Sequence, residues 1–226
     1  MDKIIYHGSQ IVLDNPTYGV GKKYNDYGLG FYCTENIELA KEWACFTKEN
    51  GYANQYSLEM DDLKILNLNS KEFHILNWLA ILIENRTFQF KNELSVAANE
   101  YIHNHFYVPY DHYDIIIGYR ADDSYFSFAE DFLQGIISLK LLSQAMRLGQ
   151  LEEQIVLKSP KAFQQLTYMK SIEVPYITYL SKRIERDHLA RQEYIYVRKE
   201  SSFQTDDIYM LDIIREEMKN DDPRLR

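Results

Sequence analysis

The chain has 226 residues, with 25 basic and 34 acidic side chains that give a formal net charge of −9. This length predicts one domain that is large enough to bury a core, and the acidic balance argues against a protein that coats nucleic acid through its phosphates. The longest uninterrupted apolar run, residues 78–83, is far shorter than the roughly 20 residues of a membrane-spanning helix.

The N-terminal part predicts short strands, one long loop and one helix. Residues 3–6 are a short apolar strand candidate that ends at His7. Residues 15–30 contain one proline and several glycines, which predicts a long irregular loop of a kind that is often functional. The chain is expected to be extended at 31–33, and Thr34 is a predicted N-cap for an amphipathic helix.

The middle of the chain predicts three strands and a helix. Two strands are expected at 52–59 and 63–68, joined by a turn, and a strongly apolar helix at 73–83. The Ile-rich run at 113–118 is bounded by turn residues, which indicates a strand that is buried on both faces.

The third part predicts another helix and a pair of strands. Ser138 is placed to cap a helix that Gly149 ends. A strand is expected at 152–158, followed by a turn with a short helix and a further strand at 166–169.

The chain is expected to form a single α+β domain. Its core covers about residues 1–170, and 171–226 is a C-terminal extension. The extension predicts one helical stretch, a strand-like piece at 194–197 and a charged terminal helix. There is no internal repeat or low-complexity linker.

Features of the N-terminus and the cysteines predict a cytoplasmic protein. The first residues lead directly into an apolar strand, without the longer apolar segment of a signal peptide. Only two cysteines are present, Cys33 and Cys45. They are better explained as reduced, partly buried thiols than as a disulfide framework.

Three motifs follow one another along the chain. "YHGS" begins at Tyr6, "YGLGFY" ends at Tyr32 with Trp43 eleven residues beyond it, and "EEQIVL" begins at Glu152. Taken alone, each is weak, since a His-Gly pair more often forms a structural turn and a Gly-x-Gly lacks the third glycine of a dinucleotide fingerprint. Likewise, Tyr32 and Trp43 by themselves suit core packing. The order and spacing of all three carry the signal.

Together the motifs resemble the ADP-ribosyltransferase superfamily, in its His-Tyr-Glu branch of diphtheria toxin and poly(ADP-ribose) polymerases. They also resemble an uncharacterised bacterial branch found beside antitoxin genes and in phage-defence loci. The resemblance covers roughly residues 4–44 and 113–169. It implies an ADP-ribosyltransferase fold, in which two small antiparallel sheets form a split core around an NAD cleft with flanking helices.

The resemblance assigns an NAD site to the first two motifs. His7 matches the histidine that binds a ribose hydroxyl, and Gly8, followed by Ser9, matches the glycine whose main chain holds the nicotinamide amide. The absent side chain of Gly8 would let the ligand approach closely. Tyr32 and Trp43 match the two aromatics that enclose the nicotinamide ring.

The glycine-rich loop supplies the other predicted contacts to NAD. Gly30 belongs to the segment that makes room for the ligand. Lys22 and Lys23 are candidates for the NAD diphosphate, although lysines on loops are usually only solvated. By position, the segment before the third motif corresponds to the target-recognition loop, and its candidates for acceptor choice are Arg147, Gln150 and Glu152.

The third catalytic position is either Glu153 or Gln154. Aligning the apolar strand with the wider family selects Glu153, whereas the bacterial branch keeps the glutamine. Neighbouring residues on a strand point to opposite faces, so only one of them can enter the pocket. The pattern does not choose between them, and Gln154 is preferred. In the alternative interpretation, both lie at an exposed strand end.

The implied activity is a glycosyltransferase reaction that uses NAD as substrate and no metal. Nicotinamide is displaced through an oxocarbenium-like transition state, and a glutamine at the third position favours single transfers over chain elongation. The expected acceptor is protein, RNA or DNA, and the expected partner is an antitoxin protein. A catalytically inactive NAD-fold module and an NAD glycohydrolase remain the alternatives.

The "HNH" at 103–105 is interpreted as polar surface and not as a metal site.

Overall fold

The computed structural model describes residues 2–121, 123–148, 153–200 and 206–225. Its elements follow in the order β1 (Asp2–Ser9), β2 (Phe31–Cys33), α1 (Ile37–Ala44), β3 (Gly51–Glu59), β4 (Ile65–Asn67), α2 (Ile75–Asn85), α3 (Glu93–Phe106), β5 (Ile115–Gly118), α4 (Asp123–Leu133), α5 (Leu139–Ala145), β6 (Gln154–Leu157), α6 (Pro160–Gln164), β7 (Leu166–Val174), α7 (Tyr176–Glu200), α8 (Met210–Arg215) and a 3₁₀ turn (Pro223–Leu225).

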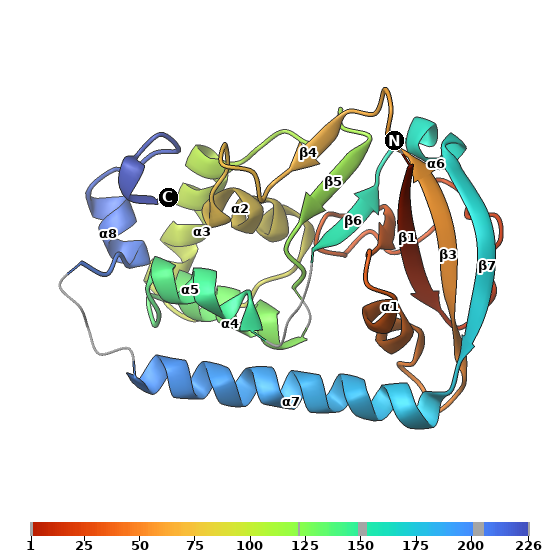
Figure 1. The fold of residues 1–226 in the computed structure, drawn as a ribbon. Helices are drawn as coiled ribbons and strands as arrows, with labels where there is room; N and C mark the ends of the chain where they lie inside the picture. Colours follow the sequence, from red (N-terminus) through yellow and green to blue (C-terminus); the bar gives the residue numbers. More distant parts are fainter. Residues whose placement is uncertain (1, 122, 149–152, 201–205, 226) are drawn as a thin grey trace.

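Among the described residues, the strands form two sheets that stand side by side (Figure 1). One has three antiparallel strands in the order β1-β3-β7, and the other has four strands in the order β2-β6-β5-β4. The α+β class is therefore confirmed. The expectation of two antiparallel sheets is wrong for the second sheet, because β4 pairs with β5 in parallel. A parallel pair needs a long crossover, and α2 and α3 provide it.

The strands predicted in the N-terminal part and the middle of the chain are all present, and β1 continues to Ser9, beyond its predicted end at His7. β3 and β4 belong to different sheets, so the turn between them joins the sheets and not two paired strands. β7 continues to Val174, beyond the predicted end at 169. The boundary expected near residue 170 thus lies inside a core strand.

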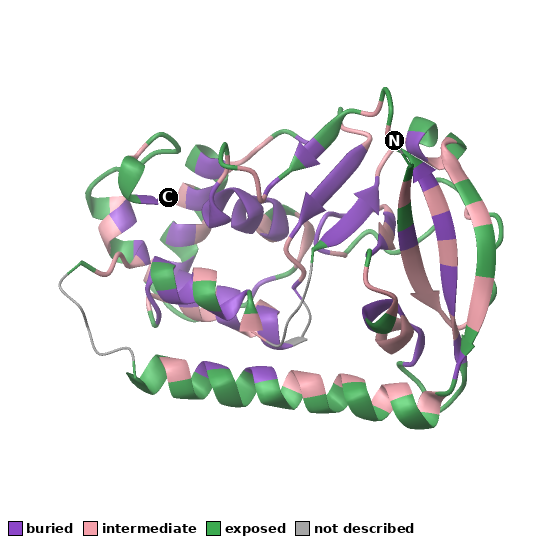
Figure 2. Ribbon diagram, in the orientation of Figure 1, coloured by how far each residue is buried: buried purple, intermediate pink, exposed green. Residues whose placement is uncertain are grey.

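The Ile-rich strand is buried on both faces, as its composition predicts. Ile116 belongs to a core cluster formed with helices α2 to α5, whereas Ile115 and Ile117 belong to a second cluster that includes side chains of β1, β3 and β6. Figure 2 shows β5 and β6 buried throughout. Alternate residues of one strand therefore join two different cores, which explains the lack of a polar period in the sequence.

Helix α1 begins slightly later than predicted. Its N-cap is Asn36, whose Oδ1 accepts hydrogen bonds from the N–H groups of Glu38 at 2.9 Å and Leu39 at 3.3 Å. Thr34 instead pairs with Tyr6 in an isolated bridge that joins β1 to the end of β2. The predicted cap Ser138 is confirmed for α5, and the short helix expected after the next strand is α6, with Ser159 as its N-cap.

Helix α7 runs along one side of the molecule, from the sheet that contains β7 to helices α4 and α5 (Figure 1). The strand-like piece predicted at 194–197 is wrong, because it lies within this helix of 25 residues. Tyr194 stacks on Phe128 of α4 with ring centroids 3.9 Å apart, and its hydroxyl donates to Asp131 at 2.6 Å. Tertiary packing therefore overrides the β-propensity of this piece.

We expect Tyr194→Phe to lower the free energy of unfolding by about 1–2 kcal/mol, because it removes a hydrogen bond to a charged acceptor and keeps the ring stack. The matched control is Tyr196→Phe on the same helix, whose ring is 66% exposed and whose substitution should change stability by less than about 0.5 kcal/mol. Urea unfolding of both variants measures the difference. Equal stabilities would show that the contact to Asp131 does not hold α7 in place.

No helix among the described residues combines the length and the apolar character that crossing a membrane requires.

Candidate functional site

His7 joins the first two motifs. Its Nδ1 lies 2.7 Å from the main-chain oxygen of Tyr32, and its ring stacks on Phe31 with centroids 4.4 Å apart. A carbonyl oxygen can only accept a hydrogen bond, so Nδ1 carries the proton and Nε2 presents a lone pair. His7 is therefore arranged to accept a hydrogen bond, for example from a hydroxyl group of a ligand.

Burial keeps this imidazole neutral. Desolvation lowers the pKa of His7 from its ordinary value of 6.5, and the hydrogen bond to the Tyr32 carbonyl opposes that shift only in part. The neutral form predominates at pH 7, which preserves the acceptor at Nε2.

The lowered pKa predicts how His7 contributes to stability as the pH changes. Below about pH 6.5 an unfolded chain protonates this histidine, whereas the folded chain does so only at lower pH, so the contribution is lost as the pH falls. We expect the stability of the parent relative to His7→Asn to decrease by at most about 1.4 kcal/mol per pH unit in that window. Urea unfolding between pH 5 and 8 tests this. A parent that gains relative stability on acidification contradicts it.

The Tyr32 hydroxyl forms hydrogen bonds with the loop that precedes β2. The hydroxyl donates to the Gly28 oxygen at 2.6 Å and accepts from the Tyr27 N–H at 3.1 Å. Burial is the main cause that raises the pKa of Tyr32 far above 10, so the phenol remains protonated. The hydroxyl thus closes the glycine-rich loop, and the half-buried ring is the part of Tyr32 that a ligand can contact.

Strand pairing brings the third motif to Tyr32. Tyr32 on β2 lies opposite Val156 on β6, and paired residues of antiparallel strands project to the same face. Gln154 precedes Val156 by two residues and shares that face, whereas Glu153 points the other way and is exposed. The geometry therefore favours Gln154 over Glu153 as the third position.

His7 and Tyr32 are connected through the backbone and not through their rings. The His7 ring stacks on Phe31, and neighbouring residues of a strand project to opposite faces. The Tyr32 ring thus lies on the face shared with Gln154. The His7 and Tyr32 side chains therefore do not face each other across one slot but lie on either side of β2.

The amide of Gln154 lies in a buried polar cluster. Its Nε2 donates to Asp26 Oδ2 and to the Tyr119 main-chain oxygen, at 3.0 Å each. Asp26 also accepts from Arg86 at 2.8 Å and from the Ala121 N–H at 2.8 Å. Asp26 and Arg86 are functional candidates that the sequence patterns do not reveal, since the Asn-Asp-Tyr-Gly stretch resembles an ordinary turn.

Gly8 packs against helix α1. A Cβ atom at this position would lie 2.1 Å from the Ala40 oxygen and 2.7 Å from the Ala44 nitrogen. The missing side chain is therefore required for the close approach of α1 to β1. Gly8 thus has a role in packing beside the predicted approach of a ligand, which stays a prediction. The close approach also explains why Ala40, completely buried at this contact, is small.

Trp43 of α1 is half-buried and already stacked. The guanidinium carbon of Arg120 lies 4.1 Å from its ring centroid, a cation–π contact. Within the described part of the chain, its buried Nε1 has no hydrogen-bond partner. The aromatic that the resemblance assigns to nicotinamide thus has a planar cation on one face.

The remaining predicted NAD contacts serve mostly local structure. Ser9 donates to the Ile11 oxygen at 2.6 Å and accepts from Asn54. Gly30 lets its loop lie against β6, because a Cβ atom there would be 2.6 Å from Val156 Cγ1. Lys22 and Lys23 lie on the exposed surface of the loop.

A third lysine, Lys158, contacts the glycine-rich loop from the end of β6. Its Nζ donates to the main-chain oxygens of Tyr27 and Leu29, the latter at 2.6 Å. Desolvation lowers the pKa of Lys158 to about 8, although the charge of Asp111 opposes the shift. This lysine therefore fixes the loop that carries Tyr32 and Gly28.

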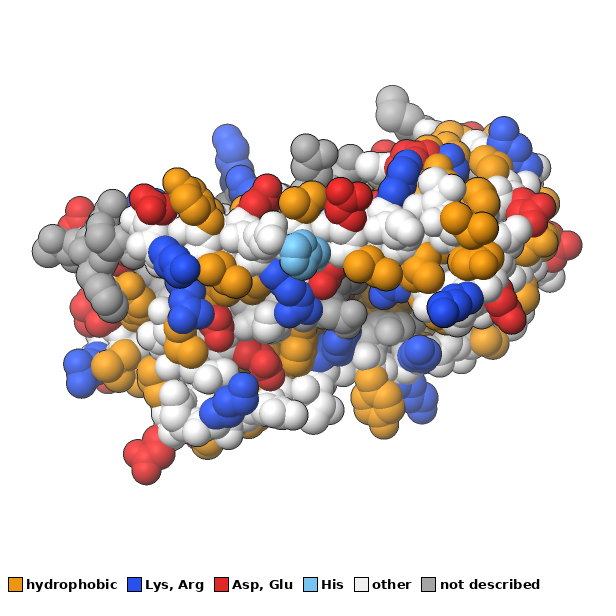
Figure 3. All heavy atoms as spheres, turned by 90° about the horizontal axis from the view of Figure 1, so that it is seen from below, with side chains coloured by type: hydrophobic (Ala, Val, Ile, Leu, Met, Phe, Trp, Pro, Cys, Tyr) orange, Lys and Arg blue, Asp and Glu red, His pale blue; other side chains and the backbone are white. Residues whose placement is uncertain are grey.

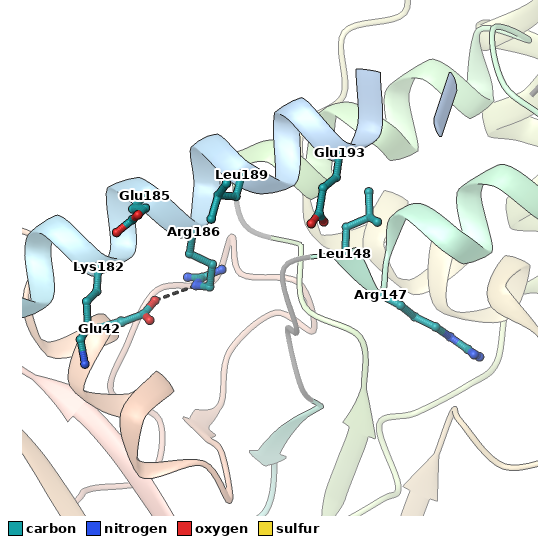
Figure 4. Close-up of a pocket in the computed structure, with 8 residues that line it drawn as sticks. All are labelled: Glu42, Arg147, Leu148, Lys182, Glu185, Arg186, Leu189 and Glu193. Carbon is teal, nitrogen blue, oxygen red and sulfur yellow. Dashed lines mark hydrogen bonds and ion pairs between the residues drawn. The ribbon is translucent and has the colours of Figure 1, made fainter. Parts of the chain in front are cut away.

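Two of the three candidates for acceptor choice, Gln150 and Glu152, lie outside the described residues. Arg147 is exposed, and its Nη2 lies 3.5 Å from the Tyr119 hydroxyl. It borders a cavity of about 550 Å³ between α7 and the body of the protein, where Arg186 pairs with Glu42 at 2.6 Å (Figure 4). The other lining residues are Leu148, Lys182, Glu185, Leu189 and Glu193.

The outer face of α7 mixes apolar, basic and acidic side chains (Figure 3).

The histidines of "HNH" lie on α3, and His103 among them is 3.4 Å from Glu84 of α2. Among the residues that the structure describes, no three His, Cys, Asp or Glu side chains are grouped to hold a metal ion.

Comparison with known proteins gives a family match. Residues 3–168 match the sequence model of a family described as "Protein of unknown function (DUF3990)". The matched segment runs from β1 into β7 and includes all three motifs. No curated protein and no solved structure matches the chain.

Proposed function

Since the chain belongs to the DUF3990 family of proteins of unknown function, we propose its activity from the geometry of its own site: it transfers single ADP-ribose units from NAD to a macromolecular acceptor. The proposal makes the protein a mono-ADP-ribosyltransferase, in line with the superfamily that its motifs resemble.

The convergence of the three motifs supports this proposal most directly. His7 of the first motif donates to the backbone of Tyr32 in the second, and the strand of Tyr32 pairs with the strand of Gln154 in the third. These residues are as much as 147 positions apart in the sequence. The three strands β1, β2 and β6 thus bring the three motifs next to one another, as one shared ligand site would require.

Each group has a chemical role in the proposed reaction. The Tyr32 ring supports nicotinamide, and Gln154, on the same face of β2, holds the ribose that carries it. His7 Nε2, on the other side of β2, accepts a hydrogen bond from a hydroxyl of the second ribose of NAD. The bond between ribose C1 and the nicotinamide nitrogen breaks with its electrons leaving on nicotinamide. An acceptor oxygen or nitrogen then bonds to C1 and loses its proton to solvent. Fixed groups around the oxocarbenium-like transition state lower its barrier.

The glutamine at the third position favours the transfer of a single ADP-ribose unit over chain elongation. A glutamine supplies a hydrogen bond to the ribose but not the negative charge of a carboxylate, which would help to activate a second ribose for elongation. The proposal therefore specifies single transfers. If nicotinamide stacks on Trp43, it takes the ring face opposite the Arg120 guanidinium or replaces that cation.

The biological setting is part of the proposal. A chain of this kind would act in the cytoplasm as the toxin of a toxin–antitoxin or phage-defence system, held inactive by an antitoxin protein. Its acceptor would be RNA, DNA or protein.

The test is incubation of the chain with NAD labelled in its adenylate phosphate, in the presence of separate pools of RNA, DNA and protein. Label bound to one pool, with release of nicotinamide, is the expected result, and His7→Ala serves as the inactive control. Free ADP-ribose without labelled macromolecule would identify an NAD glycohydrolase. Binding of NAD without release of nicotinamide would identify an inactive binding module.

A further inference from the structure

We infer that Asp26 is the positioning residue for Gln154, and that it holds the amide with the nitrogen inward and the oxygen toward the ligand. The ligand-facing part of this inference rests on the proposed function. Its structural part, the fixed orientation of the amide, stands on the contacts of the buried cluster alone.

The orientation of the amide follows from the chemistry of its neighbours. Gln154 Nε2 donates to Asp26 Oδ2 and to the Tyr119 oxygen, at 3.0 Å each. Both partners carry only acceptor atoms at these contacts. A flipped amide would place its oxygen against two other oxygens, and in a side chain that is only 3% exposed this arrangement is strongly unfavourable.

Asp26 is itself held by groups from two other segments. Arg86, at the C-terminal end of α2, donates to Oδ1 at 2.8 Å, and the Ala121 N–H donates to Oδ2 at 2.8 Å. The carboxylate is 5% exposed. Its position is therefore determined independently of Gln154, so it can act as a template for the amide.

This arrangement leaves the oxygen as the Gln154 amide atom that a ligand would contact in the proposed site. Both protons of Nε2 are used, and no described residue donates a hydrogen bond to Oε1. An oxygen of this kind selects a ligand group that donates, such as a hydroxyl of ribose. The site would thus contain two acceptors for ribose hydroxyls, one at His7 and one at Gln154.

A glutamate in place of Gln154 would not be a conservative replacement. One of its oxygens would lie about where Nε2 lies now, against the Asp26 carboxylate and the Tyr119 carbonyl. The charged and titratable groups around this position include Asp26 and Tyr27 from the loop before β2, Arg86 at the C-terminal end of α2, the Tyr32 phenol from β2 and Glu153, which directly precedes β6. Arg86 already pairs with Asp26, so a second carboxylate would favour its protonated form.

The experiment compares Gln154→Glu, Asp26→Asn and the double variant with the parent between pH 5 and pH 8. The control is Gln55→Glu on β3, where the amide donates to the Met169 sulfur and to no other side chain of the described residues. Urea unfolding gives the folding equilibrium constant, and release of nicotinamide from NAD gives the activity.

For Gln154→Glu we expect the folding equilibrium constant, relative to the parent, to fall at least about tenfold from pH 5 to pH 8. When the introduced carboxyl group is protonated, it donates to Asp26 as the amide does, and this stabilising form is lost as the pH rises through its elevated pKa. Nicotinamide release should follow the same trend, while Gln55→Glu shows neither effect.

The double variant separates positioning from general damage. Combining Asp26→Asn with Gln154→Glu restores a single carboxylate in the cluster near Arg86, so most of the loss at pH 8 should be recovered, and the two single losses should not add. Additive losses, a double variant that does not fold, or a Gln154→Glu variant equal to the parent at pH 8 would each overturn the inference. If the parent itself releases no nicotinamide, the proposed function fails, while the unfolding measurements still decide whether Asp26 orients Gln154.

Discussion

His7→Ala is expected to lower kcat/KM for release of nicotinamide from NAD at least about 100-fold, which corresponds to the loss of one oriented hydrogen bond in the transition state. The side chain contributes an acceptor at Nε2 that is fixed by the bond from Nδ1 to the Tyr32 oxygen. Alanine removes both. The kinetics are measured at saturating and subsaturating NAD so that binding and turnover are separated.

The same substitution also weakens the fold, and this has to be measured beside the activity. The Tyr32 oxygen loses its partner and Phe31 loses a stacked ring, a cost of about 1–3 kcal/mol. The matched control is His188→Ala on the exposed face of α7, which should leave both activity and stability unchanged. A folded His7→Ala protein with activity within about threefold of the parent would remove His7 from the mechanism.

Gly8→Ala is expected to destabilise the protein by about 3 kcal/mol or more, or to prevent folding, because the added methyl group overlaps main-chain atoms that cannot rotate away. It would lie 2.1 Å from the Ala40 oxygen and 2.8 Å from Trp43 Cβ. Any surviving folded protein must shift α1 away from β1. Trp43 would move with the helix, so NAD binding should weaken together with stability.

Two other glycines provide the comparison for Gly8. Gly51 faces the same helix from β3, with the Ala44 oxygen 2.2 Å from its would-be Cβ, so Gly51→Ala should be equally damaging. Gly19 has a φ of +81° and nothing within 4 Å, so Gly19→Ala should cost only about 1–2 kcal/mol of backbone strain. Unfolding midpoints of the three variants decide the matter. A Gly8→Ala protein as stable as Gly19→Ala would show that α1 is not packed on β1 as described.

Local sequence signals predicted much of the fold. The apolar run at 113–118 indicated a strand buried on both faces, and Ser138 indicated a helix start, because these features depend on a few consecutive residues. The prediction of a strand at 194–197 was wrong. β-branched and aromatic residues are also stable in a helix when their side chains pack on a partner such as Phe128. The parallel pairing of β4 with β5 has no local signal, because it depends on the path of the intervening helices.

The sequence by itself, through the resemblance of its three motifs, identified His7 and Tyr32 as candidates and left the third position between Glu153 and Gln154. Only the tertiary structure decided what these side chains face: Asp26, 128 positions from Gln154, directs the amide, and α1 fills the space beside Gly8. Hydrogen bonds and close contacts between distant segments depend on the path of the whole chain through space, and no short pattern of residues records that path.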